Sequence, residues 1–307
     1  MEKIVVLSGG TGSSKLIRGM QRLSRFTVVA NVADNAWFHG LYVCPDIDTV
    51  TYTLAGIANR KHGWGIEGDT FRVLRQLKRL GAKDTWFRLG DLDLATSMLR
   101  TSLLKEGASL TEVTKRIGEM LGIPSWPVLP ATDAHVETRI VTEEKGDLHL
   151  QEFWVREKGR PSVKSVRYKG IGRARETAEV AASISEADRI VIPPANPVTS
   201  ILPILSVGRI RRALEESSAR KVAVSPMIGK GPVSGPAAKF MASRGIPPTS
   251  EGVAELYEGL VDVLIVDEKD EAKAREIEKS GVSCLVRSTL MRGASDAERL
   301  AREVLKA

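Results

Sequence analysis

The amino-acid sequence predicts an α/β protein with a Rossmann-like, doubly wound and mostly parallel sheet. Short runs of apolar, mostly β-branched residues recur along the chain, which is typical of strands buried on both faces. Each run precedes a polar loop and a helical stretch, an alternation that favours helices on both faces of a parallel sheet. Two further stretches interrupt this alternation. The apolar runs are residues 4–7, 27–30, 189–192, 221–224, 263–266 and 282–286.

The first run ends at Ser8-Gly9-Gly10, where a buried strand enters a tight loop, and Leu16, Ile17 and Met20 then mark one face of a helix. The first interruption, residues 50–122, has helical patterns and little strand signal, with Ser109-Leu110-Thr111-Glu112 as a capping box. The second, residues 126–170, alternates in two segments, 136–141 and 148–155, around Lys145-Gly146-Asp147. We predict a helical insertion and an antiparallel hairpin, both within one domain spanning residues 1–307.

Composition points to a globular cytoplasmic protein. The chain has 307 residues, of which 42% are hydrophobic and 27% charged, enough for a large core. The first strand starts so early that no signal peptide is expected, and no apolar run is long enough to span a bilayer. Cys44 and Cys284 form no CxxC pair, which argues against a zinc ribbon or disulfide framework and favours a reducing compartment.

The net charge of +7 indicates an anionic partner. Basic residues are interleaved with acids, as in residues 211–216, and no dense basic run carries aromatic residues. Solvated helix faces explain most of this charge, so a small anionic ligand is expected and a nucleic acid is not. The four histidines are scattered, and no hydrolytic triad or histidine-based zinc pattern emerges.

The loop after the first strand is the leading candidate site. Glycines allow close backbone approach, and the following helix N-terminus attracts anions. Lys15 can reach a phosphate. The loop lacks the spacing of a P-loop, and Lys15 replaces the third glycine of the dinucleotide fingerprint. A merely tight strand-to-helix turn is the alternative. The predicted phosphate-binding residues of this loop are Gly9, Gly10, Thr11, Gly12 and Lys15.

Acidic residues follow in two places. Asp34 comes directly after the second strand, where it either caps a turn or binds a ribose hydroxyl in a nicotinamide-dependent oxidoreductase. Asp46 and Asp48 open an apolar helix, where the pair is predicted to bind a hard cation through carboxylate oxygens, or either one acts as a base on an attacking hydroxyl. The alternative is that one of them caps the helix. Cys44 is expected to pack in the core.

Later loops supply the rest of the site. Trp64 suits stacking against a flat ring, whereas Asp69 and Asp91 either shape the pocket or cap helices. Proline-stiffened and glycine-containing loops follow the strands at 189–192 and 221–224, and together they predict a second anion or nucleoside site. The candidate residues in these two loops are Asn196, Thr199, Ser200, Ser225 and Gly235.

In order and placement, these motifs resemble the 2-phospho-L-lactate transferase family of deazaflavin coenzyme F-420 biosynthesis. Single motifs are weak, but the resemblance extends from Ser8 to beyond Asp267. The residues that carry it are Ser8-Gly9-Gly10-Thr11-Gly12 with Lys15-Leu16, Pro45-Asp46-Ile47-Asp48-Thr49-Val50, Trp64-Gly65-Ile66-Glu67, Asp69-Thr70-Phe71, Leu89-Gly90-Asp91, Asn196-Pro197-Val198-Thr199-Ser200-Ile201, Ser225-Pro226 and Pro232-Val233-Ser234-Gly235-Pro236-Ala237.

The resemblance implies a magnesium-dependent transferase. A ribityl hydroxyl of 7,8-didemethyl-8-hydroxy-5-deazariboflavin would attack a phospholactyl or related three-carbon phospho-acid linked to guanosine, and GMP would leave. It places Asp48 and Arg88 against the deazaflavin, with the glycine loop and the loops at 196–200 and 225–239 on the phosphates and guanosine. The resemblance also implies a homodimer, the assembly expected for members of this family. The chain departs from the family pattern at Asn35, Leu92 and Ser97. A related nucleotide-sugar-binding regulatory protein is the main alternative.

Overall fold

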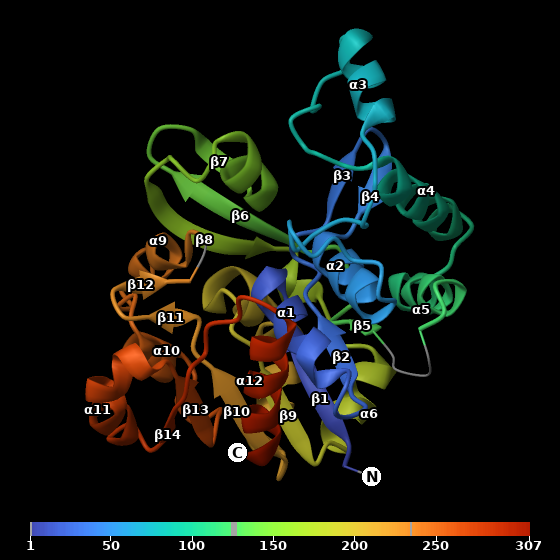
Figure 1. Cartoon of the computed structure of the whole chain (residues 1–307). Coiled ribbons are helices and arrows are strands. Elements are labelled where there is room, and N and C mark those ends of the chain that lie inside the picture. Colours follow the sequence, from blue (N-terminus) through green and yellow to red (C-terminus); the bar gives the residue numbers. More distant parts are fainter. Residues whose placement is uncertain (1, 124–127, 234) are drawn as a thin grey trace.

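Seven parallel strands form the central sheet of the protein (Figure 1). The structure is a computed structural model that describes residues 2–123, 128–233 and 235–307, so the predicted start of the hairpin at residue 126 and the motif residue Ser234 lie outside it. In spatial order the strands are β14 (Ser283–Val286), β13 (Val263–Val266), β10 (Arg220–Val224), β9 (Arg189–Ile192), β1 (Ile4–Ser8), β2 (Thr27–Ala30) and β5 (Val128–Pro130).

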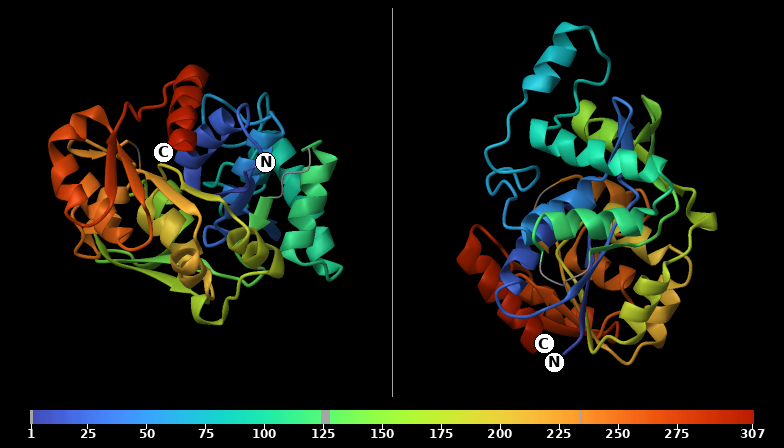
Figure 2. Two further views of the ribbon diagram at one scale, coloured as in Figure 1. Left: turned by 90° about the horizontal axis from the view of Figure 1, so that it is seen from below. Right: turned by 90° about the vertical axis from the view of Figure 1, so that its right-hand side faces the viewer.

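The sheet confirms the predicted doubly wound fold. All six predicted runs are strands, because apolar residues on both faces need cover from helices on both sides. Helices α1 (Gly10–Met20) and α12 (Ala294–Lys306) cover one face, and α6 (Ala178–Ser185) and α8 (Ile210–Glu216) cover the other (Figure 2). Strand order runs in opposite directions on the two sides of the β1–β9 pair, so the topological switch point lies between these strands.

Between the strands of the first half lies a helical stretch. It contains α2 (Pro45–Leu54), α3 (Arg72–Arg79), α4 (Asp91–Lys105) and α5 (Leu110–Met120), and Ser109 and Glu112 form the predicted capping box at α5. It is preceded by an unpredicted small antiparallel pair, β3 (Ala36–Phe38) and β4 (Leu41–Val43). Helix α3 stands away from the rest of the chain, at the end opposite the two termini (Figures 1 and 2).

The predicted hairpin is present, but its second strand is shorter than predicted. Strands β6 (Glu137–Thr142) and β7 (Gly146–His149) pair antiparallel, and β8 (Val163–Lys169) adds a third strand beside β6. The prediction of a strand over 148–155 is wrong beyond His149, because Glu152–Arg156 form the π-helical turn η1. In this turn Phe153 is buried against Phe240, while the neighbouring Trp154 is exposed.

Short elements in the second half of the chain complete the fold. The apolar residues of the central sheet and its covering helices form one continuous core. No helix in the described ranges is long and apolar enough to cross a membrane. The remaining elements are η2 (Ile171–Arg173), η3 (Pro197–Ile201), α7 (Leu202–Leu205), β11 (Met227–Ile228), β12 (Gly231–Pro232), α9 (Ala237–Ala242), α10 (Ser250–Leu256), η4 (Glu268–Lys273) and α11 (Ala274–Glu278).

Candidate active site

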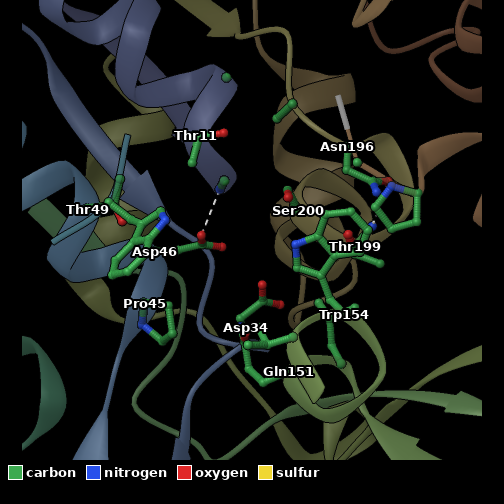
Figure 3. Close-up of a pocket in the computed structure, with 18 of the residues that line it drawn as sticks. Thr11, Asp34, Pro45, Asp46, Thr49, Gln151, Trp154, Asn196, Thr199 and Ser200 are labelled. Carbon is green, nitrogen blue, oxygen red and sulfur yellow. Dashed lines mark hydrogen bonds between the residues drawn. The ribbon is translucent and has the colours of Figure 1, made fainter. Parts of the chain in front are cut away.

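A cavity of about 730 Å³ opens at the carboxyl ends of the central strands. Its walls come from the loops after β1, β9 and β10, from the first turns of α2 and α4, and from residues 150–158 (Figure 3). Gly10, Lys15 and Asp48 all line it, as the sequence predicted. The site therefore lies beside the switch point between β1 and β9, where doubly wound sheets bind ligands.

Close backbone approach explains the glycine loop. A Cβ on Gly12 would lie 2.0 Å from the carbonyl oxygen of Pro194, and one on Gly9 would lie 2.6 Å from the Cβ of Ser200. Glycine at both positions thus lets the loop after β1 pack directly on the loop after β9. Two neighbouring strand tips are joined in this way into one wall of the cavity.

Two of the loop amides are already used within the protein. The Gly10 N–H donates to Oδ1 of Asp46 at 2.7 Å, and the Gly9 N–H donates to Oγ of Ser13 at 3.2 Å. The first-turn amides of Thr11 and Gly12 have no partner within a helix, so they are the ones that can bind an anion. Lys15 lines the cavity, is exposed, and forms no ion pair or hydrogen bond with the residues that the structure covers.

Asp34 and Asp46 face each other across Asn31. The Nδ2 of Asn31 donates to Oδ2 of Asp46 at 2.9 Å and to Oδ1 of Asp34 at 3.2 Å. Burial raises the pKa of Asp34, and the neighbouring Asp46 raises it further. Burial also raises the pKa of Asp46, against the effect of its bonds from Asn31 and Gly10. Within the described ranges neither carboxylate pairs with a lysine or arginine, so the pair lacks a compensating cation.

Asp48 has a cation of its own. Its carboxylate accepts a hydrogen bond from Nη2 of Arg100 on α4, whose Nη1 also donates to the carbonyl oxygen of Tyr42 at 3.2 Å. Burial raises the pKa of Asp48, and Arg100 draws it back. Burial opposes the charge on Arg100, but Asp48 and other neighbours outweigh it and the pKa of Arg100 lies above its usual value. Helix α2 begins after Cys44, and neither Asp46 nor Asp48 caps it with its side chain, so the capping alternative for this pair is wrong.

A fourth carboxylate, Asp93, stands beside the Asp48–Arg100 pair and has no ion-pair partner of its own among the described residues. It is buried in the first turn of α4 and lines the cavity. Burial, then the charge of Asp48, raises the pKa of Asp93 to about 7. Tyr52 also lines the cavity, and its hydroxyl lowers the pKa of Asp93 against these two effects.

The predicted acceptor wall comes from the stretch between α2 and α4. Trp64 and Arg88 line the cavity, and the guanidinium of Arg88 lies 4.6 Å from the ring centre of Phe71. Asp69 and Asp91 both cap helices, but neither caps the helix that it was expected to start: Asp69 was expected at α3 and Asp91 at α4. Asp69 accepts hydrogen bonds from the Leu92 and Asp93 amides at the start of α4, and Asp91 accepts those of Arg72 and Val73 at the start of α3.

The loops after β9 and β10 form the opposite side. Thr199 and Ser200 are buried and line the cavity, in the π-helical turn η3. Oδ1 of Asn196 accepts from the amides of Val198 and Thr199, so only its amide nitrogen is available to a ligand. Ser225 lines the cavity too, but its hydroxyl lies 3.1 Å from that of Ser250 and accepts from the Met227 amide. Gly235 also lines the cavity.

Several residues of the site escaped the sequence analysis. Arg100 could have been found, because Asp93, Ser97 and Arg100 recur at helical spacing and form a polar stripe on the buried side of α4. Trp154 and Lys158 had no such signal, since their segment has the alternation of a strand. Cys44 is confirmed as a packing residue: it is buried, and burial raises the pKa of its thiol to about 12.

Comparison with known proteins gives a consistent result. The family model described as "2-phospho-L-lactate transferase CofD" matches residues 4–303. A 2-phospho-L-lactate transferase of Methanopyrus kandleri is 45% identical, over 99% of this chain and 97% of that protein. One from Methanosarcina mazei is 39% identical, over 99% and 100%. A crystal structure of the UPF0052-family protein BH3568 from Bacillus halodurans matches with a TM-score of 0.68 at 19% identity, over 99% of this chain and 98% of that one, which supports the fold alone.

Proposed function

The chain belongs to the CofD family of 2-phospho-L-lactate transferases, and we propose that it transfers a phospholactyl group from a guanosine-diphosphate-linked donor to 7,8-didemethyl-8-hydroxy-5-deazariboflavin. The acceptor is a ribityl hydroxyl, and GMP is the product that leaves. This reaction belongs to coenzyme F-420 biosynthesis. A related three-carbon phospho-acid in place of phospholactate is compatible with the same chemistry.

One observation carries the proposal: a single cavity joins anion-binding groups to a carboxylate and aromatic wall. The free amides of Thr11 and Gly12 and the unpaired Lys15 suit the phosphates of the donor. Asp48 and Trp64 line the same cavity and suit a flat, hydroxyl-bearing acceptor. Transfer to a hydroxyl depends chiefly on placing both reactants together among groups that stabilise negative charge, which such a cavity provides.

Asp34 and Asp46 fit a magnesium ion better than the predicted pair of Asp46 and Asp48. Both are buried and uncompensated, whereas Asp48 is bound by Arg100. No cluster of three or more histidine, cysteine or acidic side chains suited to a metal occurs in the described ranges. Mg²⁺ commonly binds one or two carboxylates and completes its shell with phosphate and water. When bound, it would neutralise charge on the donor phosphates.

The chain's own residues then have separate tasks. Lys15 and the first-turn amides of α1 bind the donor phosphates and favour the charge that spreads over them during transfer. Asp48, fixed by Arg100, accepts a hydrogen bond from the acceptor and orients its ribityl hydroxyl, with Arg88 and Trp64 holding the ring. The hydroxyl oxygen forms a bond to phosphorus, the bond from phosphorus to the GMP oxygen breaks, and the hydroxyl proton passes to the carboxylate of Asp48.

The test is a transfer assay with purified protein, the deazariboflavin, Mg²⁺ and lactyl-diphosphoguanosine. We expect the phospholactyl deazaflavin by mass spectrometry and one GMP per product. A parallel reaction with the phosphoenolpyruvate-derived donor measures the preference for the three-carbon acid. If no activated acid gives product while the protein binds nucleotide sugars tightly, the chain is a regulatory protein and the proposal is wrong.

We also propose that two copies associate through the region around α3, in a cytoplasmic enzyme. Helix α3 has no buried residue, and Val73 and Leu80 are 47% and 72% exposed. Leu92 and Met98 on α4 are 50% and 60% exposed. Light scattering should give a mass twice that of the 33.4 kDa chain, and Leu80→Lys should reduce the measured mass to that of a single chain. A monomeric wild type at all concentrations would contradict this.

A further inference from the structure

The segment 150–158 forms a wall of the cavity that no part of the proposed function yet uses. It includes η1, a π-helical turn, and the other π-helical turn, η3, carries Thr199 and Ser200 in the opposite wall. Such turns are rare and are found mostly at functional sites. In η1, Phe153 is buried in the core, while the adjacent Trp154 lines the cavity with 44% of its surface exposed.

The position of Trp154 is fixed by the chain around it. A Cβ on Gly159 would lie 2.9 Å from Cζ3 of the indole, so the ring rests on a glycine that has φ of +63°. The ammonium of Lys239 on α9 holds the following backbone, donating to the carbonyl oxygens of Gly159, Arg160 and Pro161 at 2.7, 3.0 and 3.3 Å. An exposed aromatic ring held in one place at a cavity wall is ready to stack against a ligand.

Its location favours the donor over the acceptor. In Figure 3, Trp154 lies on the side of the cavity that carries Asn196, Thr199 and Ser200, across from Pro45 and Asp46. The ring of Phe153 packs on Phe240 of α9, with centroids 5.5 Å apart, which ties η1 to the element that follows the β10 loop. The acceptor wall already has its own aromatic residue in Trp64.

Lys158 adds a charge to the same segment. It lines the cavity and has a φ of +56°, a backbone conformation that is uncommon for lysine. Its ammonium makes no ion pair or hydrogen bond with residues in the described ranges. A strained, unpaired lysine two residues beyond a π-helical turn fits contact with an anion.

We propose that this segment binds the nucleotide half of the donor, with Trp154 stacking on the nucleobase and Lys158 contacting a phosphate. This inference rests on the proposed function, because it assumes that a nucleotide enters the cavity. Stacking on an aromatic ring contributes about 1–3 kcal/mol per base, or roughly 5- to 150-fold in affinity. It tolerates different bases, so the other contacts of the cavity must supply any preference for guanine.

The test compares the binding of GDP, guanosine and the deazariboflavin by calorimetry, with Mg²⁺ present. Trp154→Ala should weaken both GDP and guanosine at least fivefold, Trp154→Phe should retain most of the affinity, and neither should alter deazariboflavin binding. Lys158→Gln should weaken GDP and leave guanosine within twofold. Trp37→Ala and Lys164→Gln, exposed residues outside the cavity wall, are the controls and should change nothing.

Two results would overturn the inference alone. The first is that the wild type binds GDP and the Trp154→Ala variant, shown by circular dichroism to be folded, binds GDP equally well. The other is a Trp154→Ala variant that loses the deazariboflavin and keeps GDP, which would make Trp154 part of the acceptor site. A wild type that binds neither GDP nor guanosine would overturn the proposed function together with this inference, and the outcomes are thereby distinguished.

Discussion

Replacing Arg100 by methionine tests the most deeply buried ion pair of the site. The arginine side chain is 1% exposed and that of Asp48 is 9% exposed, so neither charge has water to replace its partner. Removing one member of a buried pair usually costs about 3–5 kcal/mol, since the other charge remains without compensation. Methionine keeps much of the volume, so this cost reflects charge more than packing. We expect Arg100→Met to lower the free energy of unfolding by about that amount.

The assay is urea unfolding followed by circular dichroism at pH 7.5, extended to a double-mutant cycle. Asp48→Asn with Arg100→Met should lose far less than the sum of the single variants, because no charge is then left unpaired. Arg212→Met, which removes an exposed pair with Glu216, is the control and should have no measurable effect. A loss below about 1 kcal/mol in Arg100→Met, or additive single variants, would refute the reasoning.

Three further predictions concern other residues of the same cavity. Gly12→Ala should abolish transfer, because its Cβ would meet the Pro194 carbonyl oxygen at 2.0 Å, whereas Gly172→Ala has open space and should be active in the same assay. Asp93 has a folded-state pKa of about 7 against an ordinary 3.8, so its contribution to stability is complete below about pH 4 and is lost as the pH rises through 7. Asp93→Asn should therefore raise the melting temperature above pH 7 and not below pH 4. Parallel plots of melting temperature against pH for the variant and the wild type would contradict this. Chelation of Mg²⁺ should stop transfer, and excess Mg²⁺ should restore it. Asp46→Asn should lower the transfer activity at least 100-fold, with only partial recovery at high Mg²⁺ concentration. Full activity in the presence of chelator would remove the metal from the mechanism.

The strand tips were predictable because their signals are local. An apolar run and the loop after it lie within about ten residues, and parallel strands bring such loops to one edge of a sheet. This placed Gly10, Asp48 and Thr199 at a common cavity. The partner of Asp48 was not predictable in the same way, since Arg100 lies 52 residues away and only the packing of α4 on β4 brings the two together.

Local sequence patterns gave wrong predictions in loops where some polar groups bind other parts of the protein and others face the cavity. The amide of Gly10 looked free to bind phosphate, but it donates to Asp46, and Asp69 serves α4 as a cap. In residues 148–155 the alternation of a strand concealed a π-helical turn, because Phe153 can be buried by either structure. Periodicity identifies which side chain is buried, and it does not fix which one reaches the cavity.

A crystal structure of the protein with GDP, Mg²⁺ and the deazariboflavin tests the central claim most directly. The claim is that one cavity holds both substrates, with phosphates at Thr11, Gly12 and Lys15 and the deazaflavin ring between Trp64 and Arg88. The account predicts both ligands in this cavity, with a ribityl hydroxyl turned toward the phosphates and Asp48. A deazaflavin bound elsewhere on the protein, or a nucleotide whose phosphates lie away from the glycine loop, would contradict it.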